Sequence, residues 1–329
     1  MQNISINIAF GWELKEKNIK VKGGYDLLNV ISLCDGMSCG QIALTELNVP
    51  INKYYASEIY DKAIQTTLEN FPNTIQSGNL LELYQNEKWL KSLPQIDLIL
   101  FGFPCRNNSK AVKGREGYDN GLKGDSSWLF YPCADIVDWI RINNNPNVMF
   151  LCENVDGMTE GDRKIVSDRL GVDYIHIDSN LFSAADRARL YWTNIKYNKS
   201  DLPKENNIVL KDILDKNVSD EYYYNCGFEF YGIDKKVCAN LHINGHDILK
   251  RVNSPLHKGA TLTSCRGGNL QKKVYDTEKN LCRKLTENEY RKLQTIPDWY
   301  KMNVAKSHIY NMCGDGWTIE VIKWFFKYI

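Results

Sequence analysis

Hydrophobic and polar positions alternate in blocks of two kinds through the first 195 residues. Short apolar runs are typical of buried strands, and apolar positions that recur every three to four residues are typical of helices. Strands are predicted at 28–33, 54–57, 96–101, 148–152, 174–177 and 190–195, and helices at 40–47, 61–70, 128–143 and 161–170. Strands that alternate with helices predict repeated βα units and an α/β fold.

The pattern changes at Lys196 and stays irregular and polar to about Leu281, with an aromatic cluster at 222–224 and a glycine break at 267–268. This change predicts a separate, loop-rich lobe. A helix is predicted at 286–294, because Thr286 and Glu289 have capping-box spacing. An amphipathic helix at 318–328 is expected to return to the first lobe.

The composition excludes several classes of protein. The chain has 329 residues, 43% hydrophobic and 25% charged, which is typical of globular proteins. Lys and Arg number 41 and Asp and Glu 40, so a wholly basic nucleic-acid coat is excluded, although a local basic face is not. No run approaches the ~18 apolar residues of a membrane helix, and we expect a cytoplasmic, intracellular protein.

The ten cysteines are scattered and form no CxxC pair, which favours free thiols in a reducing compartment. His242 and His246 are four residues apart, but no cysteine pair stands nearby at zinc-finger spacing. We therefore expect no metal site.

The first candidate for chemistry is the small-residue turn 34–40, which joins a predicted strand to a helix. Glycine there lets a ligand approach the backbone. Glu58 follows Gly36 by 22 residues at the end of the next strand, where a carboxylate can accept both hydroxyls of a ribose. A tight turn without a ligand remains an alternative.

Cys105 follows a predicted buried strand in Gly102-Phe103-Pro104-Cys105, where active-site groups of open α/β folds usually lie. A cysteine there can act as a nucleophile, although most cysteines are inert core residues. The loop at 106–124 is polar, rich in glycine and basic, which is typical of a mobile lid that meets phosphates.

Two further polar groups border predicted strands. Glu153 lies where the strand at 148–152 ends, so its carboxyl is expected at the same sheet edge as Cys105. Arg187 and Arg189 project the same way if their segment is extended. Each group alone could also be part of a surface salt bridge.

The order of these motifs resembles the cytosine-C5 DNA methyltransferases. That family has a glycine turn, an acidic ribose ligand, Pro-Cys, Glu-Asn-Val and Arg-x-Arg in this order, then a variable region and a closing helix. The resemblance spans 29–195 and 283–322. The stretches 183–189 and 314–317 look most like the de novo DNA methyltransferase branch.

The resemblance implies a doubly wound, Rossmann-like S-adenosylmethionine-dependent methyltransferase domain with a smaller, loop-rich target-recognition lobe. The catalytic domain is expected at 1–195 plus 306–329 and the target-recognition lobe at 196–305. The expected S-adenosylmethionine site comprises Cys34, Asp35, Gly36, Met37, Cys39, Gly40, Glu58, Ile59, Asn79, Leu80, Pro104, Leu129, Asp315, Gly316 and Trp317.

The resemblance also implies the catalytic roles. Cys105 is the nucleophile, Glu153 contacts the ring N3 and the exocyclic amine of cytosine, and Arg189 holds O2. Arg187 supports this contact to O2 or meets phosphate. Because these groups cannot reach a stacked base, the target cytosine is expected to be flipped out of the duplex.

The stretch 249–275 carries six basic and no acidic residues, and it supplies the local positive face; a solvated basic loop is the alternative. The expected DNA contacts are Arg106, Ser109, Lys113, Arg115, Arg266, Lys272 and Lys273.

Four positions depart from the family's pattern. Cys34 replaces a phenylalanine, Asn79 the adenine-binding aspartate, Arg106 a glutamine or asparagine, and Asp315 an asparagine or arginine. An asparagine at 79 still offers a carbonyl oxygen to an adenine amino group.

Three functions compete. The first is methylation of duplex DNA, with a cognate restriction endonuclease as a candidate partner and a nucleoid location in a prokaryote or phage. The second is methylation of tRNA by the same chemistry. The third is a silent DNA-binding relative, which has no chemical need for Cys105, Glu153 and Arg189 together.

Overall fold

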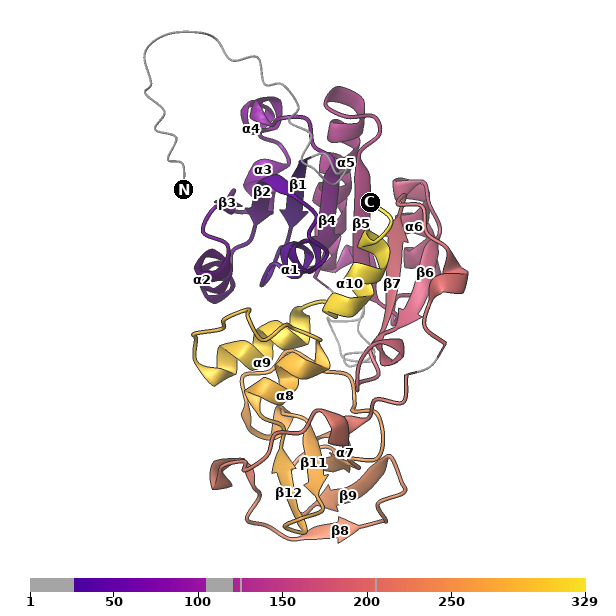
Figure 1. Cartoon of the computed structure of the whole chain (residues 1–329). Coiled ribbons are helices and arrows are strands. Elements are labelled where there is room, and N and C mark those ends of the chain that lie inside the picture. Colours follow the sequence, from indigo (N-terminus) through magenta and orange to yellow (C-terminus); the bar gives the residue numbers. More distant parts are fainter. Residues whose placement is uncertain (1–26, 105–120, 125, 205) are drawn as a thin grey trace, which may run out of the picture.

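The computed structural model of the chain describes residues 27–104, 121–124, 126–204 and 206–329. A sheet in the order β3-β2-β1-β4-β5-β7-β6 forms the larger lobe (Figure 1). All paired neighbours are parallel except β7, which is antiparallel to β5 and β6. The strands are β1 (Leu28–Leu33), β2 (Ile51–Ser57), β3 (Ile75–Gln76), β4 (Leu98–Gly102), β5 (Met149–Val155), β6 (Tyr174–Asp178) and β7 (Ala188–Thr193).

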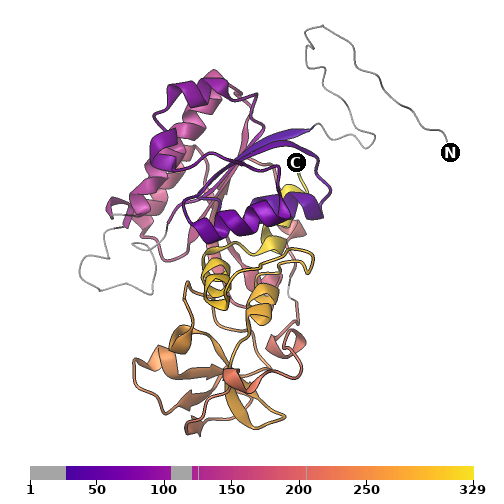
Figure 2. The ribbon, with the colours of Figure 1, turned by 90° about the vertical axis from the view of Figure 1, so that its left-hand side faces the viewer.

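Helices cover both faces of this sheet, as Figure 2 shows. One face packs against α1 (Cys39–Glu46), α2 (Asp61–Asn70) and α10 (Ile319–Phe326). The other packs against α3 (Leu80–Leu83), α4 (Glu87–Ser92), α5 (Phe130–Asn143) and α6 (Glu160–Leu170). The strand order reverses between β1 and β4, and ligands of doubly wound sheets bind at the carboxyl ends of strands beside such a point.

The doubly wound fold predicted from the sequence is confirmed. The strand at 28–33 and the helix at 61–70 have the predicted bounds. The capping box of Thr286 and Glu289 is also present. The pattern did not predict helices α3 and α4 or the two-residue strand β3, because these elements are too short to display a period. It also did not predict helix α9 (Lys306–Asp315).

The smaller lobe contains a second sheet, in the order β12-β11-β10-β9-β8. This lobe is loop-rich as predicted, although the sequence pattern did not predict its sheet. Its strands have only three to five residues, and β10 and β11 meet through one residue pair, Asn253 with Val274. The elements are β8 (Phe228–Phe230), β9 (Val237–Leu241), α7 (Asp247–Lys250), β10 (Arg251–Asn253), β11 (Lys273–Asp276) and β12 (Leu281–Lys284). A separate apolar cluster, which includes Cys238 and Val252, fills this lobe.

Helices α8 (Glu287–Leu293) and α9 (Lys306–Asp315) lie between the two sheets (Figure 1). Tyr290 and Leu293 of α8 belong to the same apolar cluster as α1 and α10. The core of the larger lobe thus extends over 285–304, and the domain boundary at 305 stays a prediction.

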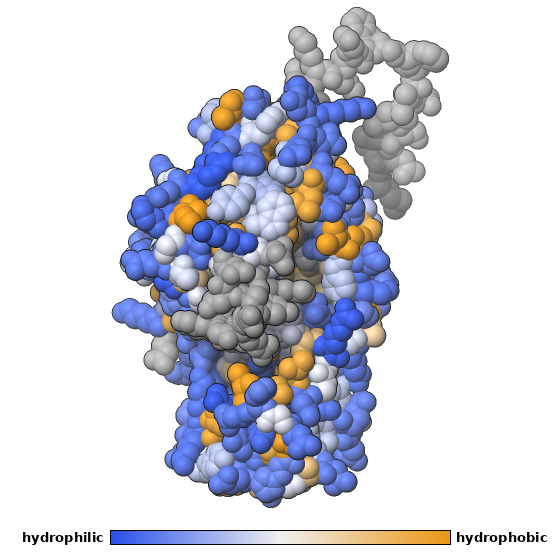
Figure 3. Space-filling model, turned by 180° about the vertical axis from the view of Figure 1, so that it is seen from behind, coloured by the Kyte–Doolittle hydropathy of each residue, from blue (hydrophilic) through white to orange (hydrophobic). Residues whose placement is uncertain are grey.

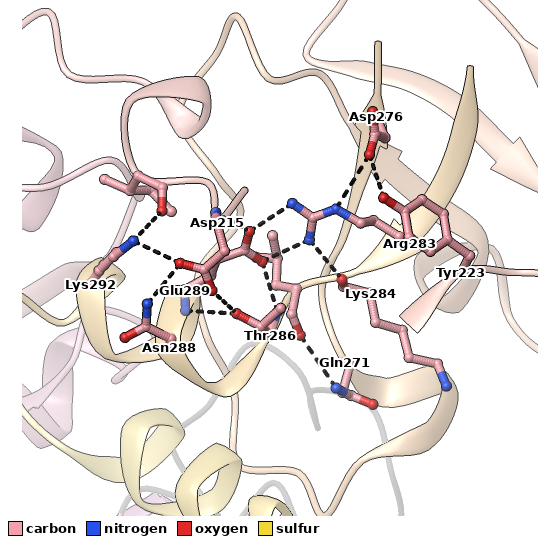
Figure 4. Close-up of polar contacts among 12 residues, drawn as sticks. Asp215, Tyr223, Gln271, Asp276, Arg283, Lys284, Thr286, Asn288, Glu289 and Lys292 are labelled. Carbon is pink, nitrogen blue, oxygen red and sulfur yellow. Dashed lines mark hydrogen bonds and ion pairs between the residues drawn. The ribbon is translucent and has the colours of Figure 1, made fainter. Parts of the chain in front are cut away.

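A buried ion pair joins α8 to the smaller sheet (Figure 4). Two guanidinium nitrogens of Arg283, on β12, donate to the carboxylate of Glu289, at 2.8 and 2.6 Å. The same carboxylate accepts from the backbone N–H groups of Thr286 at 2.7 Å and Asp215 at 2.9 Å. The charges are therefore paired and hydrogen-bonded, which buried ions require.

Candidate active site

The turn after β1 has an unusual backbone. Cys34, Gly36 and Ser38 have φ angles of 54°, 59° and 58°, in the left-handed region that favours glycine. The Asp35 carboxylate holds the turn by accepting from the Ser38 hydroxyl at 2.6 Å and the Tyr54 hydroxyl at 3.0 Å. Burial raises the pKa of Asp35 to about 6. Residues in such conformations cluster at ligand sites.

Glu58 connects this turn with the turn after β2. One carboxylate oxygen accepts from the Gly36 N–H at 2.7 Å. The other accepts from the N–H groups of Ile59 at 2.8 Å and Tyr60 at 2.9 Å. The acidic group predicted 22 residues after Gly36 therefore lies at the predicted turn, at the carboxyl edge of the sheet.

The two turns fit an adenosine cofactor such as S-adenosylmethionine. A Cβ built on Gly36 or Gly78 would meet no atom within 4 Å, so space lies beside both backbones. The side-chain oxygen of Asn79 accepts from the Leu81 N–H at 3.1 Å and keeps a second lone pair. The side chain of Ile59 is exposed, and its backbone N–H binds the Glu58 carboxylate.

Other residues expected at the cofactor site lie in the core. Met37 and Cys39 are buried, and burial raises the pKa of the Cys39 thiol to about 12. Leu80 is buried among the helices of the α5 face, and Leu129 packs against the same cluster. A Cβ on Gly40 would lie 2.3 Å from the Leu100 side chain, so this glycine allows α1 to pack on β4.

Glu153 is held from two sides at the carboxyl edge of the sheet. Its Oε1 lies 2.8 Å from Nε of Arg189, on β7, and both side chains are 10% exposed. Its Oε2 accepts from the indole N–H of Trp317 at 3.0 Å. Because β7 is antiparallel to β5, Arg189 near the start of β7 lies at the same sheet edge as Glu153 near the end of β5. The structure thus brings two predicted catalytic residues together.

The Pro-Cys segment begins at the same place. Gly102 is the register partner of Glu153. The Asn154 side-chain amide donates to the Phe103 carbonyl at 2.9 Å, and the Ser127 hydroxyl donates to the Pro104 carbonyl at 2.9 Å. These two positioning residues were not predicted, although Asn154 belongs to the Glu-Asn-Val motif.

Five predicted site residues lie outside the described residues. They are Cys105, Arg106, Ser109, Lys113 and Arg115.

Arg187 is 4% exposed and points between the lobes. Its guanidinium donates to the carbonyls of Leu262 at 2.9 Å, Gly314 at 3.0 Å and Gly316 at 2.7 Å. Arg187 fixes the backbone beside Trp317.

The predicted DNA-binding residues of the smaller lobe differ in exposure. Arg266 is exposed and Lys272 is half-buried. Lys273 is 2% exposed and donates to the carbonyls of Asn269 at 2.7 Å and Gln271 at 2.9 Å. The prediction that Lys273 contacts DNA is therefore wrong, because its amine is used inside the lobe. Burial lowers the pKa of this amine to about 8.

Asp315, expected near the cofactor, joins α9 to the smaller lobe. One carboxylate oxygen accepts from the Ser264 hydroxyl, and the other accepts from the Asn311 side chain at 3.3 Å. The adjacent Gly314 allows this approach, since a Cβ there would lie 2.3 Å from the Ser264 nitrogen.

Figure 3 shows a mainly hydrophilic face with apolar side chains in small groups. None of the described helices is long and apolar enough to cross a membrane. Within the described ranges, no three His, Cys, Asp or Glu side chains form a group that could hold a metal ion.

Residues 28–329 match the family described as C-5 cytosine-specific DNA methylase. The chain belongs to this family. The predicted family is thereby confirmed.

Its relatives in the family include type II methyltransferases. M.BanI of Aneurinibacillus aneurinilyticus is 26% identical over 304 residues, which cover 83% of this chain and 62% of the relative. M.Bsp6I of Bacillus sp. (strain RFL6) is 25% identical, over 82% of this chain and 88% of the relative. The chain thus spans less than two thirds of M.BanI.

Solved structures of methyltransferases share the fold. The Entamoeba histolytica methyltransferase EhMeth has a TM-score of 0.65 and 16% identity, over 92% of this chain and 97% of that one. A Spodoptera frugiperda DNMT2 mutant has a TM-score of 0.60 and 18% identity, over 91% and 98%.

Proposed function

We propose that this protein transfers a methyl group from S-adenosylmethionine to carbon 5 of a flipped cytosine in duplex DNA. The observation that carries the proposal is the carboxylate of Glu153, held by Arg189 and Trp317 beside the end of β4. The proposed nucleophile, Cys105, follows Gly102 by three residues in the sequence.

The chemistry requires electron density at carbon 5, which is a poor nucleophile. The Cys105 thiolate adds to carbon 6, while Glu153 contacts N3 and the exocyclic amine and Arg189 holds O2. S-adenosylmethionine supplies an electrophilic methyl group when bound. Loss of the carbon 5 proton, with the carbon 6 to sulfur bond broken, restores the aromatic ring and frees the Cys105 thiolate.

Glu58 is the residue that would hold the cofactor ribose. Its carboxylate already lies between the two turns at the switch point of the sheet. The space beside Gly36 and Gly78 supports a ligand at this edge.

Trapping with 5-fluorocytosine tests the proposal. Fluorine cannot leave carbon 5 as a proton does, so duplex DNA with this base at the target should form a stable adduct on Cys105 when S-adenosylmethionine is present. Peptide mapping identifies the residue, and Cys105→Ser is expected to abolish the adduct and turnover. An adduct on another cysteine, or none on a verified target, would contradict the mechanism.

The polymer is tested separately. The match to a DNA methylase family supports DNA over tRNA, and the type II relatives support a cognate restriction endonuclease as partner. Labelled methyl groups should appear in duplex DNA and not in tRNA. Transfer to tRNA alone would favour the second function, and cofactor binding without any transfer would favour a silent relative.

A further inference from the structure

We infer that Trp317 is a positioning residue for the carboxylate of Glu153, in addition to its expected place beside the cofactor. This inference rests on the proposed function. It concerns the methyl-transfer step, because Glu153 is the group that contacts the cytosine ring.

The geometry fixes both carboxylate oxygens. Arg189 takes Oε1 at 2.8 Å and the Trp317 indole N–H takes Oε2 at 3.0 Å, so neither oxygen can turn without breaking a charge-assisted contact. An ionised carboxylate has about four acceptor positions. Two acceptor positions therefore remain for donors on the base, which are the exocyclic amine and N3 once N3 carries a proton, while the carboxylate stays in one orientation.

Gly102 supplies the space for the indole. A Cβ at position 102 would lie 2.9 Å from Nε1 of Trp317 and 3.3 Å from Oε2 of Glu153. The absence of a side chain at the end of β4 thus allows the two groups to meet. Any larger residue there would push one of them aside.

The backbone of Trp317 is held independently of its ring. Arg187 donates to the carbonyl of Gly316 at 2.7 Å, and the side-chain amide of Gln294 donates to the same carbonyl at 3.1 Å. A Cβ on Gly316 would lie 2.7 Å from the Met37 side chain, so this segment packs tightly on α1. Removal of the indole N–H should therefore leave the backbone in place.

The distinguishing variant is Trp317→Phe, which keeps an aromatic ring and removes only the N–H donor. Single-turnover methylation with saturating DNA and S-adenosylmethionine should fall about 10-fold to 100-fold, the scale of one hydrogen bond to a charged group. Calorimetric affinity for S-adenosylmethionine should stay within about twofold, since the ring is kept.

A matched control is available within the chain. The Trp299 indole N–H donates to the Glu46 carboxylate at 2.6 Å on the surface. Trp299→Phe removes the same kind of hydrogen bond and should leave the methylation rate unchanged.

Gly102→Ala gives a second, independent route to the same loss. Its added methyl should displace Trp317 from Glu153 and slow the same step. In the double variant with Trp317→Phe the rate should fall no further, because the contact is already lost.

The outcomes separate the inference from the proposed function. An active parent whose Trp317→Phe variant keeps its rate would overturn the inference alone. Weaker cofactor binding with an unchanged saturated rate would also overturn it and leave Trp317 as a cofactor contact. A parent that methylates neither DNA nor tRNA would overturn the proposed function, and the inference with it.

Discussion

Glu58 combines two tasks in one carboxylate. It accepts three backbone N–H bonds from the turns after β1 and β2, and it is the proposed ribose ligand. Sequence spacing alone predicted the second task. Because the carboxylate also binds the backbone of both turns, its loss should loosen the Gly36 turn as well as remove a ligand contact.

Glu58→Ala is therefore expected to weaken S-adenosylmethionine binding by more than about 10-fold. Each charge-assisted hydrogen bond contributes ~1.5–3 kcal/mol, and two to the ribose would be lost. Calorimetry measures the change. Glu82→Ala, on the exposed side of α3, is the control and should bind normally. Unchanged affinity in the Glu58 variant would refute its role.

Single residues also mark the limit of the sequence argument. The family resemblance predicted that Glu153 and Arg189 share a site, and they meet because β7 is antiparallel to β5. The bond between Trp317 and Glu153 could not be predicted, since it joins residues 164 positions apart. Lys273 was misjudged because a run of basic residues does not tell which amines face inward.

At the scale of the element, helix α8 depends on the buried pair of Arg283 and Glu289. Their side chains are 2% and 0% exposed, so neither charge reaches water. Removing one partner of such a pair leaves the other unpaired, which costs far more than an intact pair contributes.

Glu289→Gln is therefore expected to lower the free energy of unfolding by ~3–5 kcal/mol, as measured in urea. Thr286→Ala, which loses the helix cap and the hydrogen bond from the Thr286 hydroxyl to the Asp215 carboxylate, should cost about 1–2 kcal/mol. Asp168→Asn removes the surface pair with Lys164 and serves as the control, with no measurable change. A loss in Glu289→Gln no larger than that of the cap variant would mean that the pair is not isolated from water.

Elements were predictable where the local pattern was long enough. Strand β1 and helix α2 have strong periods and were predicted with their observed bounds. The strands of the smaller lobe were not, because β8 and β10 have three residues each, which is too few to display a period. Short strands are specified by tertiary contacts rather than by their own sequence.

At the scale of the whole molecule, one segment of the smaller lobe lies against the catalytic side. The Leu262 carbonyl accepts from Arg187, and the Ser264 hydroxyl donates to Asp315 at the end of α9. Arg266 follows on the same segment and is exposed. Its side chain is therefore carried on a stretch whose backbone is fixed relative to Glu153 and Trp317.

This placement favours Arg266 as a reader of sequence. An arginine can grip O6 and N7 of guanine with two hydrogen bonds, and such a contact contributes about 1–3 kcal/mol of discrimination. The two glycines after it have φ angles of 107° and 69°, so the backbone turns sharply beside the side chain without a Cβ in the way.

Arg266→Ala should thus blur one position of the methylated site, as seen by methylome sequencing. Lys272→Ala, a change at a half-buried lysine that is expected to contact phosphate, should weaken binding to all sequences and reduce the log-log salt slope by about one. An Arg266 variant that is slower yet equally selective would place the reader elsewhere in the smaller lobe, and would leave Arg266 as a phosphate contact fixed by the same segment.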